Sequence, residues 1–123
     1  MGIDIYVTWK GQTEDERLKQ SSAWLTVEAG SCGYLREAYH GAPYATKFLC
    51  AEAFESDEAR IPAATLRERL PHTLVLVEER ERTLYKSDDK QIEAVRQSYR
   101  DFVALCEAKE AETGEPVLVC ASY

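Results

Sequence analysis

A short segment between two glycines holds several of the side chains in this 123-residue chain that could do chemistry. Residues 33–41 read Gly-Tyr-Leu-Arg-Glu-Ala-Tyr-His-Gly and include one of the chain's two histidines. An arginine binds carboxylates or phosphates through its fork of N–H donors, and a histidine donates or accepts a proton near neutral pH. The segment therefore indicates a place where a ligand is held or a proton is moved.

Arg36 and His40 are neighbours in either regular structure that the segment could form. In a strand, residues 36, 38 and 40 share one face, and in a helix residues 36 and 40 lie about one turn apart. Tyr39 and Tyr44 are expected to orient a ligand, and Glu37 to hold the imidazole. We therefore take Arg36, Tyr39, His40 and Tyr44 as candidate ligand-binding residues, with His40 as the candidate catalytic group. The competing interpretation is that these residues are structural.

The charge of the chain limits its partners. The 15 basic residues face 22 acidic ones, which gives a net charge of −7. No basic cluster of the kind that binds nucleic acid or an anionic membrane surface is present, and no apolar run is long enough to span a membrane. Within residues 29–51, however, Arg36 and Lys47 outnumber Glu37, so this segment favours a small anionic ligand.

Two classes of function remain. The first is a ligand- or partner-binding domain that uses the segment Tyr34–Tyr44. The alternative is a small enzyme acting on an anionic metabolite, with His40 as acid or base and Arg36 as anion clamp. We favour the binding domain, because no set of nucleophile, base and orienting group is visible. A homo-oligomer is compatible with both.

The four cysteines, at positions 32, 50, 106 and 120, do not indicate a metal site. None forms a Cys-x-x-Cys pair, and no motif for a nucleotide cofactor is present, so we expect neither metal nor cofactor. Without a secretion signal the chain is predicted to be cytoplasmic, with free thiols, and it looks like a small bacterial protein. Cys50, Cys106 and Cys120 are expected to be small buried hydrophobes. Cys32 precedes His40 by eight residues and is a further candidate nucleophile.

Alternating apolar residues predict a strand over residues 3–9. Thr13 and Glu16 form a capping-box pattern that predicts a surface helix over 14–20. Residues 24–29 and 34–39 are predicted as two strands of a hairpin, with a short helix at 34–40 as the alternative for the second.

Prolines divide the middle of the chain. Pro43 could open a helix running to Phe54 with Phe48, Leu49 and Ala53 inward. A second helix is expected to begin at Pro62 and to break or kink at Pro71. Residues 73–77 suit a helix or a buried strand, and we favour the helix because residues 78–82 have poor strand propensity. Residues 78–82 carry charges of mixed sign, as on a solvated helix face.

The C-terminal region carries the clearest pattern. Asp88 and Asp89 suit a helix start, and Gly114 suits its end. An apolar stripe recurs between them at helical spacing, at Ile92, Val95, Tyr99, Phe102 and Cys106. Residues 116–122 then predict a central strand beside the first one.

These elements predict an α+β fold in one domain covering residues 1–123. A small, mostly antiparallel sheet would contain the N-terminal strand, the 24–39 hairpin and the C-terminal strand. Three or four helices would cover one face of it.

Overall fold

The order of secondary-structure elements gives the α+β fold predicted from the sequence. A computed structural model describes residues 2–23 and 29–123. Its elements in chain order are β1 (Gly2–Thr8), α1 (Glu14–Ser22), the 3₁₀ helix η2 (Ala29–Cys32), β2 (Tyr34–Ala38), α2 (Ala45–Leu49), α3 (Ala51–Ser56), β3 (Glu58–Arg60), α4 (Ala63–Thr83), α5 (Asp89–Thr113) and β4 (Leu118–Ser122).

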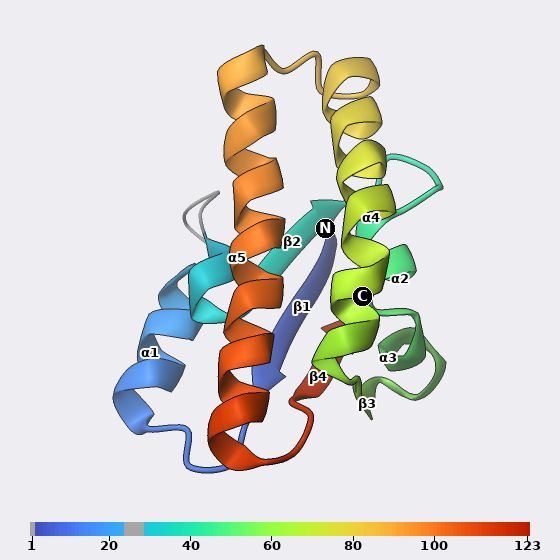
Figure 1. Ribbon diagram of the computed structural model, residues 1–123. Helices are drawn as coiled ribbons and strands as arrows, with labels where there is room; N and C mark the ends of the chain where they lie inside the picture. The colour runs from blue at the N-terminus through green and yellow to red at the C-terminus, as the bar shows by residue number, and fades with distance from the viewer. Residues whose placement is uncertain (1, 24–28) are drawn as a thin grey trace.

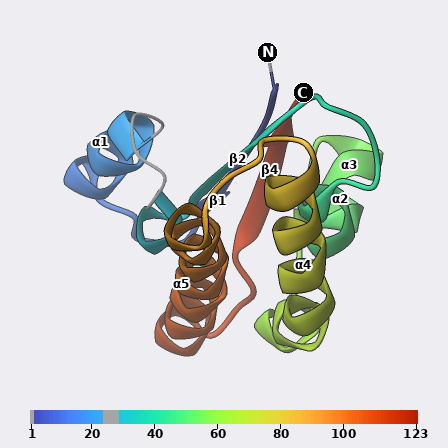
Figure 2. The ribbon, with the colours of Figure 1, turned by 90° about the horizontal axis from the view of Figure 1, so that it is seen from above.

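The four strands form one antiparallel sheet in the order β2-β1-β4-β3. The alternation in β1 turns Ile3, Ile5 and Val7 to one face, where all three are completely buried. Helices α4 and α5 cover this face, while α1 lies on one side of the sheet and α2 and α3 on the other (Figures 1 and 2). The C-terminal strand β4 is central and beside β1, as its apolar sequence predicted.

The predicted C-terminal helix is confirmed as α5. Asp88 caps it: its carboxylate accepts the backbone N–H of Gln91, and the side-chain oxygen of Gln91 accepts the backbone N–H of Asp88. Gly114 ends it in a left-handed conformation with φ of 79°, which glycine adopts without steric cost. Phe102 is fully buried at the centre of the stripe.

Helix α4 corrects the prediction of a break at Pro71. The helix continues from Ala63 to Thr83 with Pro71 inside it. The proline ring is exposed, while a neighbouring side of the helix buries Leu66, Leu70 and Leu74. Burial of that face outweighs the loss of one backbone hydrogen bond. Residues 73–77 are therefore helical.

The helix predicted from Pro43 to Phe54 is divided in two, which brings the number of α-helices in the described chain to five. The division falls at Cys50, whose backbone leaves the helical region (φ −119°, ψ 41°). Leu49 and Ala53 are fully buried as expected, but Phe48 is 38% exposed. Phe48 lies on the outer side of α2 because Ala45, Thr46 and Leu49 form its buried side.

Strand β2 confirms the strand interpretation of residues 34–39 over the helical one. It pairs with β1 along its whole length, with Leu35 opposite Ile5 and Glu37 opposite Ile3. The other predicted hairpin strand, residues 24–29, lies outside the described residues except for Ala29, which begins η2.

The four cysteines are all free thiols. Cys50 and Cys106 are buried as predicted, whereas Cys120 is only partly buried. None of the helices in the described part of the chain has the length and apolar character that a bilayer span requires.

Candidate functional site

A buried ion pair connects strand β2 with helix α4. Arg80 Nε lies 2.8 Å from Glu37 Oε2, and both side chains are only 6% exposed. Glu37 lies on the helix-covered face of β2, opposite Ile3, and Arg80 lies in the last turns of α4. A buried pair of this kind is tolerated where its remaining donors and acceptors are satisfied.

The Glu37 carboxylate also holds the start of α2. Oε2 accepts the Ala45 N–H at 2.9 Å, and Oε1 accepts the Thr46 N–H at 3.0 Å and the Thr46 hydroxyl at 2.6 Å. With the Arg80 bond, each oxygen has two donors. Glu37 therefore orients α2 rather than the His40 imidazole, which corrects the role expected from the sequence.

Arg80 fastens the loop between β2 and α2. Its guanidinium donates to the carbonyl oxygens of Ala38 (3.1 Å), Pro43 (3.0 Å) and Gly41. The Tyr44 ring lies 4.8 Å from the guanidinium carbon, in a cation–π contact. The expectation that residues 78–82 form a fully solvated face is therefore wrong at Arg80, because this residue turns toward the loop.

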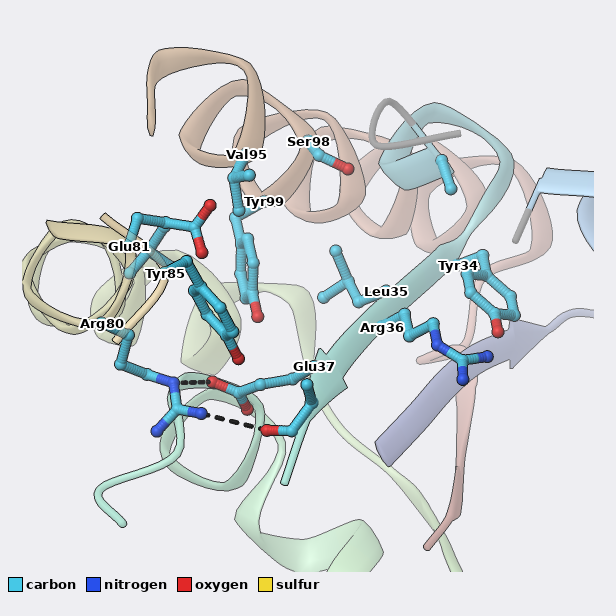
Figure 3. Close-up of a pocket in the computed structure, with 13 residues that line it drawn as sticks. Tyr34, Leu35, Arg36, Glu37, Arg80, Glu81, Tyr85, Val95, Ser98 and Tyr99 are labelled. Atoms are coloured by element: carbon cyan, nitrogen blue, oxygen red, sulfur yellow. Dashed lines mark hydrogen bonds and ion pairs between the residues drawn. The ribbon is translucent and has the colours of Figure 1, made fainter. Parts of the chain in front are cut away.

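A cleft of about 400 Å³ opens beside this ion pair, between β2, the C-terminal end of α4 and the N-terminal half of α5. Glu81 and Tyr85 form one wall, and Val95, Ser98 and Tyr99 form the other (Figure 3). Val77 of α4 also lines the cleft. Strand β2 forms the floor. Most of this surface is apolar, and a few polar groups converge on it.

The Tyr99 hydroxyl is a polar group of the cleft without a hydrogen-bond partner among the described residues. Tyr99 is only 3% exposed, and its hydroxyl has no hydrogen-bond partner in residues 2–23 and 29–123. The oxygen is not among the fully enclosed polar atoms, so it opens onto the cleft. Burial and the nearby Glu37 charge raise the pKa of Tyr99 well above its usual value, so the hydroxyl is a proton-bearing donor at neutral pH.

Glu81 is the unpaired charge of the cleft. One of its oxygens accepts the Ser87 hydroxyl at 3.3 Å, and none of the described residues forms an ion pair with it. Burial raises the pKa of this carboxyl, while the Ser87 hydrogen bond and the Arg80 charge act in the opposite direction. The aromatic residue Tyr85 is half-buried beside it, and the hydroxyls of Tyr85 and Tyr99 both point toward the Glu37 end of the cleft (Figure 3).

The two central residues of the sequence hypothesis contact different partners. The Arg36 guanidinium lies 3.3 Å from Asp4 on β1, on the face of the sheet away from α4 and α5, and its side chain points away from the cleft (Figure 3). Strand β2 ends at Ala38, so His40 lies in the following loop. There its ring packs edge-on against Tyr85, with 5.3 Å between ring centres, which places His40 at the cleft rim.

The other candidate residues lie in the loop that Arg80 fastens. Tyr39 is 40% exposed and packs edge-on against Tyr44, with 6.3 Å between ring centres. The Tyr44 hydroxyl accepts the Gly41 N–H at 3.3 Å. Tyr34 donates a hydrogen bond to Asp4, and burial together with this bond raises its pKa to about 12. These contacts lie within the Tyr34–Tyr44 segment or join it to strand β1.

Cys32 and His40 lie beyond opposite ends of β2. The strand alone is about 13 Å long, from a rise of about 3.3 Å per residue. A thiol and an imidazole must be in hydrogen-bond contact to act as a nucleophile and its base, so these two residues do not form such a pair. Among the described residues, no group of three His, Cys, Asp or Glu side chains is gathered to hold a metal ion.

Sequence reasoning missed the residues that shape the cleft. Tyr99 was recognised as a core position only, and Glu81 was grouped with a solvated run. A helical projection would place Val77, Arg80 and Glu81 on adjacent positions of one side of α4. However, the residues opposite them on β2 and α5 cannot be inferred from that projection.

The fold and the cleft define a small α+β domain with a pocket at the edge of its sheet. Comparison with protein-family models, with curated proteins and with solved structures finds no significant match for this chain.

Proposed function

We propose that this protein is a small ligand-binding domain, and that its binding site is the cleft between β2, α4 and α5. The proposal keeps the class of function favoured by the sequence and moves the site from the exposed side chains of the Tyr34–Tyr44 segment to the inner side of that segment. Tyr34 to Ala38 still contribute the floor.

The dimensions and lining of the cleft support this proposal. Sites for small molecules typically have volumes of about 300–1,000 Å³, apolar walls and a few convergent polar groups. The cleft has a volume of about 400 Å³ and presents Val77, Val95 and two tyrosine rings. The Glu37–Arg80 pair and the capping of α2 fix its floor without using the polar groups of the walls.

The observation that carries the proposal is the Tyr99 hydroxyl. A few polar groups in an apolar pocket fix the orientation of its ligand. The Tyr99 side chain is largely buried, and its hydroxyl opens onto the cleft without a hydrogen-bond partner among the described residues. A bound ligand with a complementary oxygen or nitrogen would satisfy it.

A neutral aromatic probe tests the site. We expect benzyl alcohol to shift the NMR signals of the Tyr85 and Tyr99 rings and of the Val77 and Val95 methyl groups, with a Kd of about 1 mM, which corresponds to about −4 kcal/mol. Val95→Phe should abolish these shifts, because a larger side chain fills part of the cleft.

The matched control is Val75→Phe on α4. Val75 is 48% exposed and does not line the cleft, so this variant should bind benzyl alcohol like the parent protein. Shifts that survive Val95→Phe, or that map to other parts of the chain, would show that the cleft is not the binding site.

We also propose a cytoplasmic location. It is supported by the four free thiols, since reducing compartments keep cysteines in this state.

A further inference from the structure

The cleft has an electrostatic character opposite to that expected from the sequence. Arg36, the proposed anion clamp, is paired with Asp4 on the other face of the sheet. Arg80 is paired with Glu37 and also donates to three carbonyl oxygens. The remaining charge facing the cleft is Glu81, which lacks an ion-pair partner in the described chain.

The aromatic residues around Glu81 add to this negative character. The faces of tyrosine rings carry negative potential and attract cations within about 6 Å. Tyr85 and Tyr99 border the cleft with Glu81, and the His40 ring supports Tyr85 from the rim. The whole chain, with its net charge of −7, adds a long-range field of the same sign.

We propose that the ligand of this cleft is a small organic cation, a protonated amine on an apolar body, whose ammonium group pairs with Glu81 beside the rings of Tyr85 and Tyr99. This inference rests on the proposed binding function and specifies its ligand class. The apolar body packs on Val77, Val95 and the floor of β2.

The hydrogen-bonding capacity of the cleft suits this ligand. An ammonium group offers three donors and no acceptor. The second Glu81 oxygen accepts no hydrogen bond from the described residues, and the Tyr99 oxygen can accept as well as donate. In contrast, an anionic ligand would bring its charge next to Glu81 without an unpaired basic side chain to balance it.

Three probes of similar shape and different charge test the ligand class. Benzylamine is a cation at neutral pH, benzyl alcohol is neutral and benzoate is an anion. We expect benzylamine to bind about fivefold to tenfold more tightly than benzyl alcohol, as one charge-assisted hydrogen bond permits, and benzoate to bind more weakly than both. Binding is followed by calorimetry and by the NMR signals of Val77, Val95, Tyr85 and Tyr99.

Glu81→Gln should reduce the affinity for benzylamine to that for benzyl alcohol, because it removes the charge and keeps the shape. Glu79→Gln is the matched control, since Glu79 is exposed on the same helix and does not line the cleft. Tyr99→Phe should weaken benzylamine about threefold or more through loss of one hydrogen bond. The dispersion of the NMR spectrum verifies that each variant is folded.

The outcomes separate this inference from the proposed function. If benzyl alcohol or benzoate binds in the cleft as tightly as benzylamine, the cleft is a binding site and the cation assignment is wrong. A preference for benzylamine that persists in Glu81→Gln also overturns the assignment to Glu81. If none of the three probes affects the cleft residues, both the proposed function and the cation inference fail.

Discussion

At the scale of single residues, Glu37 shows how a charged side chain can be structural at the edge of a possible site. Its carboxylate accepts two backbone N–H groups and one hydroxyl from the start of α2, and it pairs with Arg80 at 2.8 Å. Four interactions on one carboxylate leave it no free acceptor for a ligand. Tyr99 and Glu81, by contrast, keep free hydrogen-bonding capacity, and we propose that a ligand uses it.

We expect Glu37→Gln to lower the free energy of unfolding by about 3 kcal/mol or more, because it leaves the buried Arg80 charge without its counterion. Glu78→Gln is the control: it removes one of the two ion-pair partners of Arg82, from a pair in which both side chains are at least 40% exposed. It should cost less than about 1 kcal/mol. Urea unfolding measures both variants. If the two variants lose the same free energy of unfolding, the Glu37–Arg80 pair does not hold the loop.

At the scale of elements, the wall of the cleft depends on how closely η2 lies on α5. The Gly30 N–H donates to the Ser98 hydroxyl at 2.8 Å. A Cβ atom at Gly30 would lie 1.7 Å from the backbone oxygen of Ser98. Ser98 and Tyr99 are consecutive residues of the same wall, so this contact positions the cleft as well as η2.

We expect Gly30→Ala to destabilise the protein by at least about 1–3 kcal/mol, the usual cost of forcing extra volume into a packed contact, and to shift the NMR signals of Ser98 and Tyr99. The neighbouring variant Ser31→Ala, at an exposed position, should have less than about 0.5 kcal/mol of effect. Urea unfolding followed by circular dichroism gives both values. An unchanged Gly30→Ala protein would show that η2 can separate from α5 without cost.

At the scale of the whole molecule, burial keeps ionisable side chains in their uncharged, protonated form. Burial, with the charges of Glu107 and Glu110, raises the pKa of Cys106 from 9.0 to about 12. Burial and the bond to Asp4 raise the pKa of Tyr34 from 10.0 to about 12. In both cases the folded state keeps a proton that the unfolded chain loses at lower pH.

Stability should therefore fall at alkaline pH. The contribution of Cys106 is fully present below pH 9.0 and is lost as the pH rises toward about 12, because the unfolded state then binds fewer protons than the folded state. Urea unfolding in the presence of reductant, at increasing pH, measures this loss. Cys106→Ala should be less stable at neutral pH but decline less steeply, whereas parallel declines for the two proteins would contradict the role of Cys106.

Much of the fold follows from patterns that are local in the sequence. The alternation in β1, the capping boxes of α1 and α5 and the stripe from Ile92 to Cys106 each depend on residues a few positions apart. Local patterns failed where a distant contact decided the outcome. Helix α2 buries Ala45, Thr46 and Leu49 against the rest of the protein, which leaves Phe48 facing outward. The packed face of α4 carries the helix past Pro71.

The sequence by itself determined the α+β class, the order of most elements and the central position of the last strand. Tertiary structure alone decided which charges are paired: Arg36 with Asp4, Arg80 with Glu37, and Glu81 with none of the described residues. The physical reason is that charge pairing depends on distances of a few ångströms between side chains far apart in the sequence. The cleft arises only when β2, α4 and α5 come together.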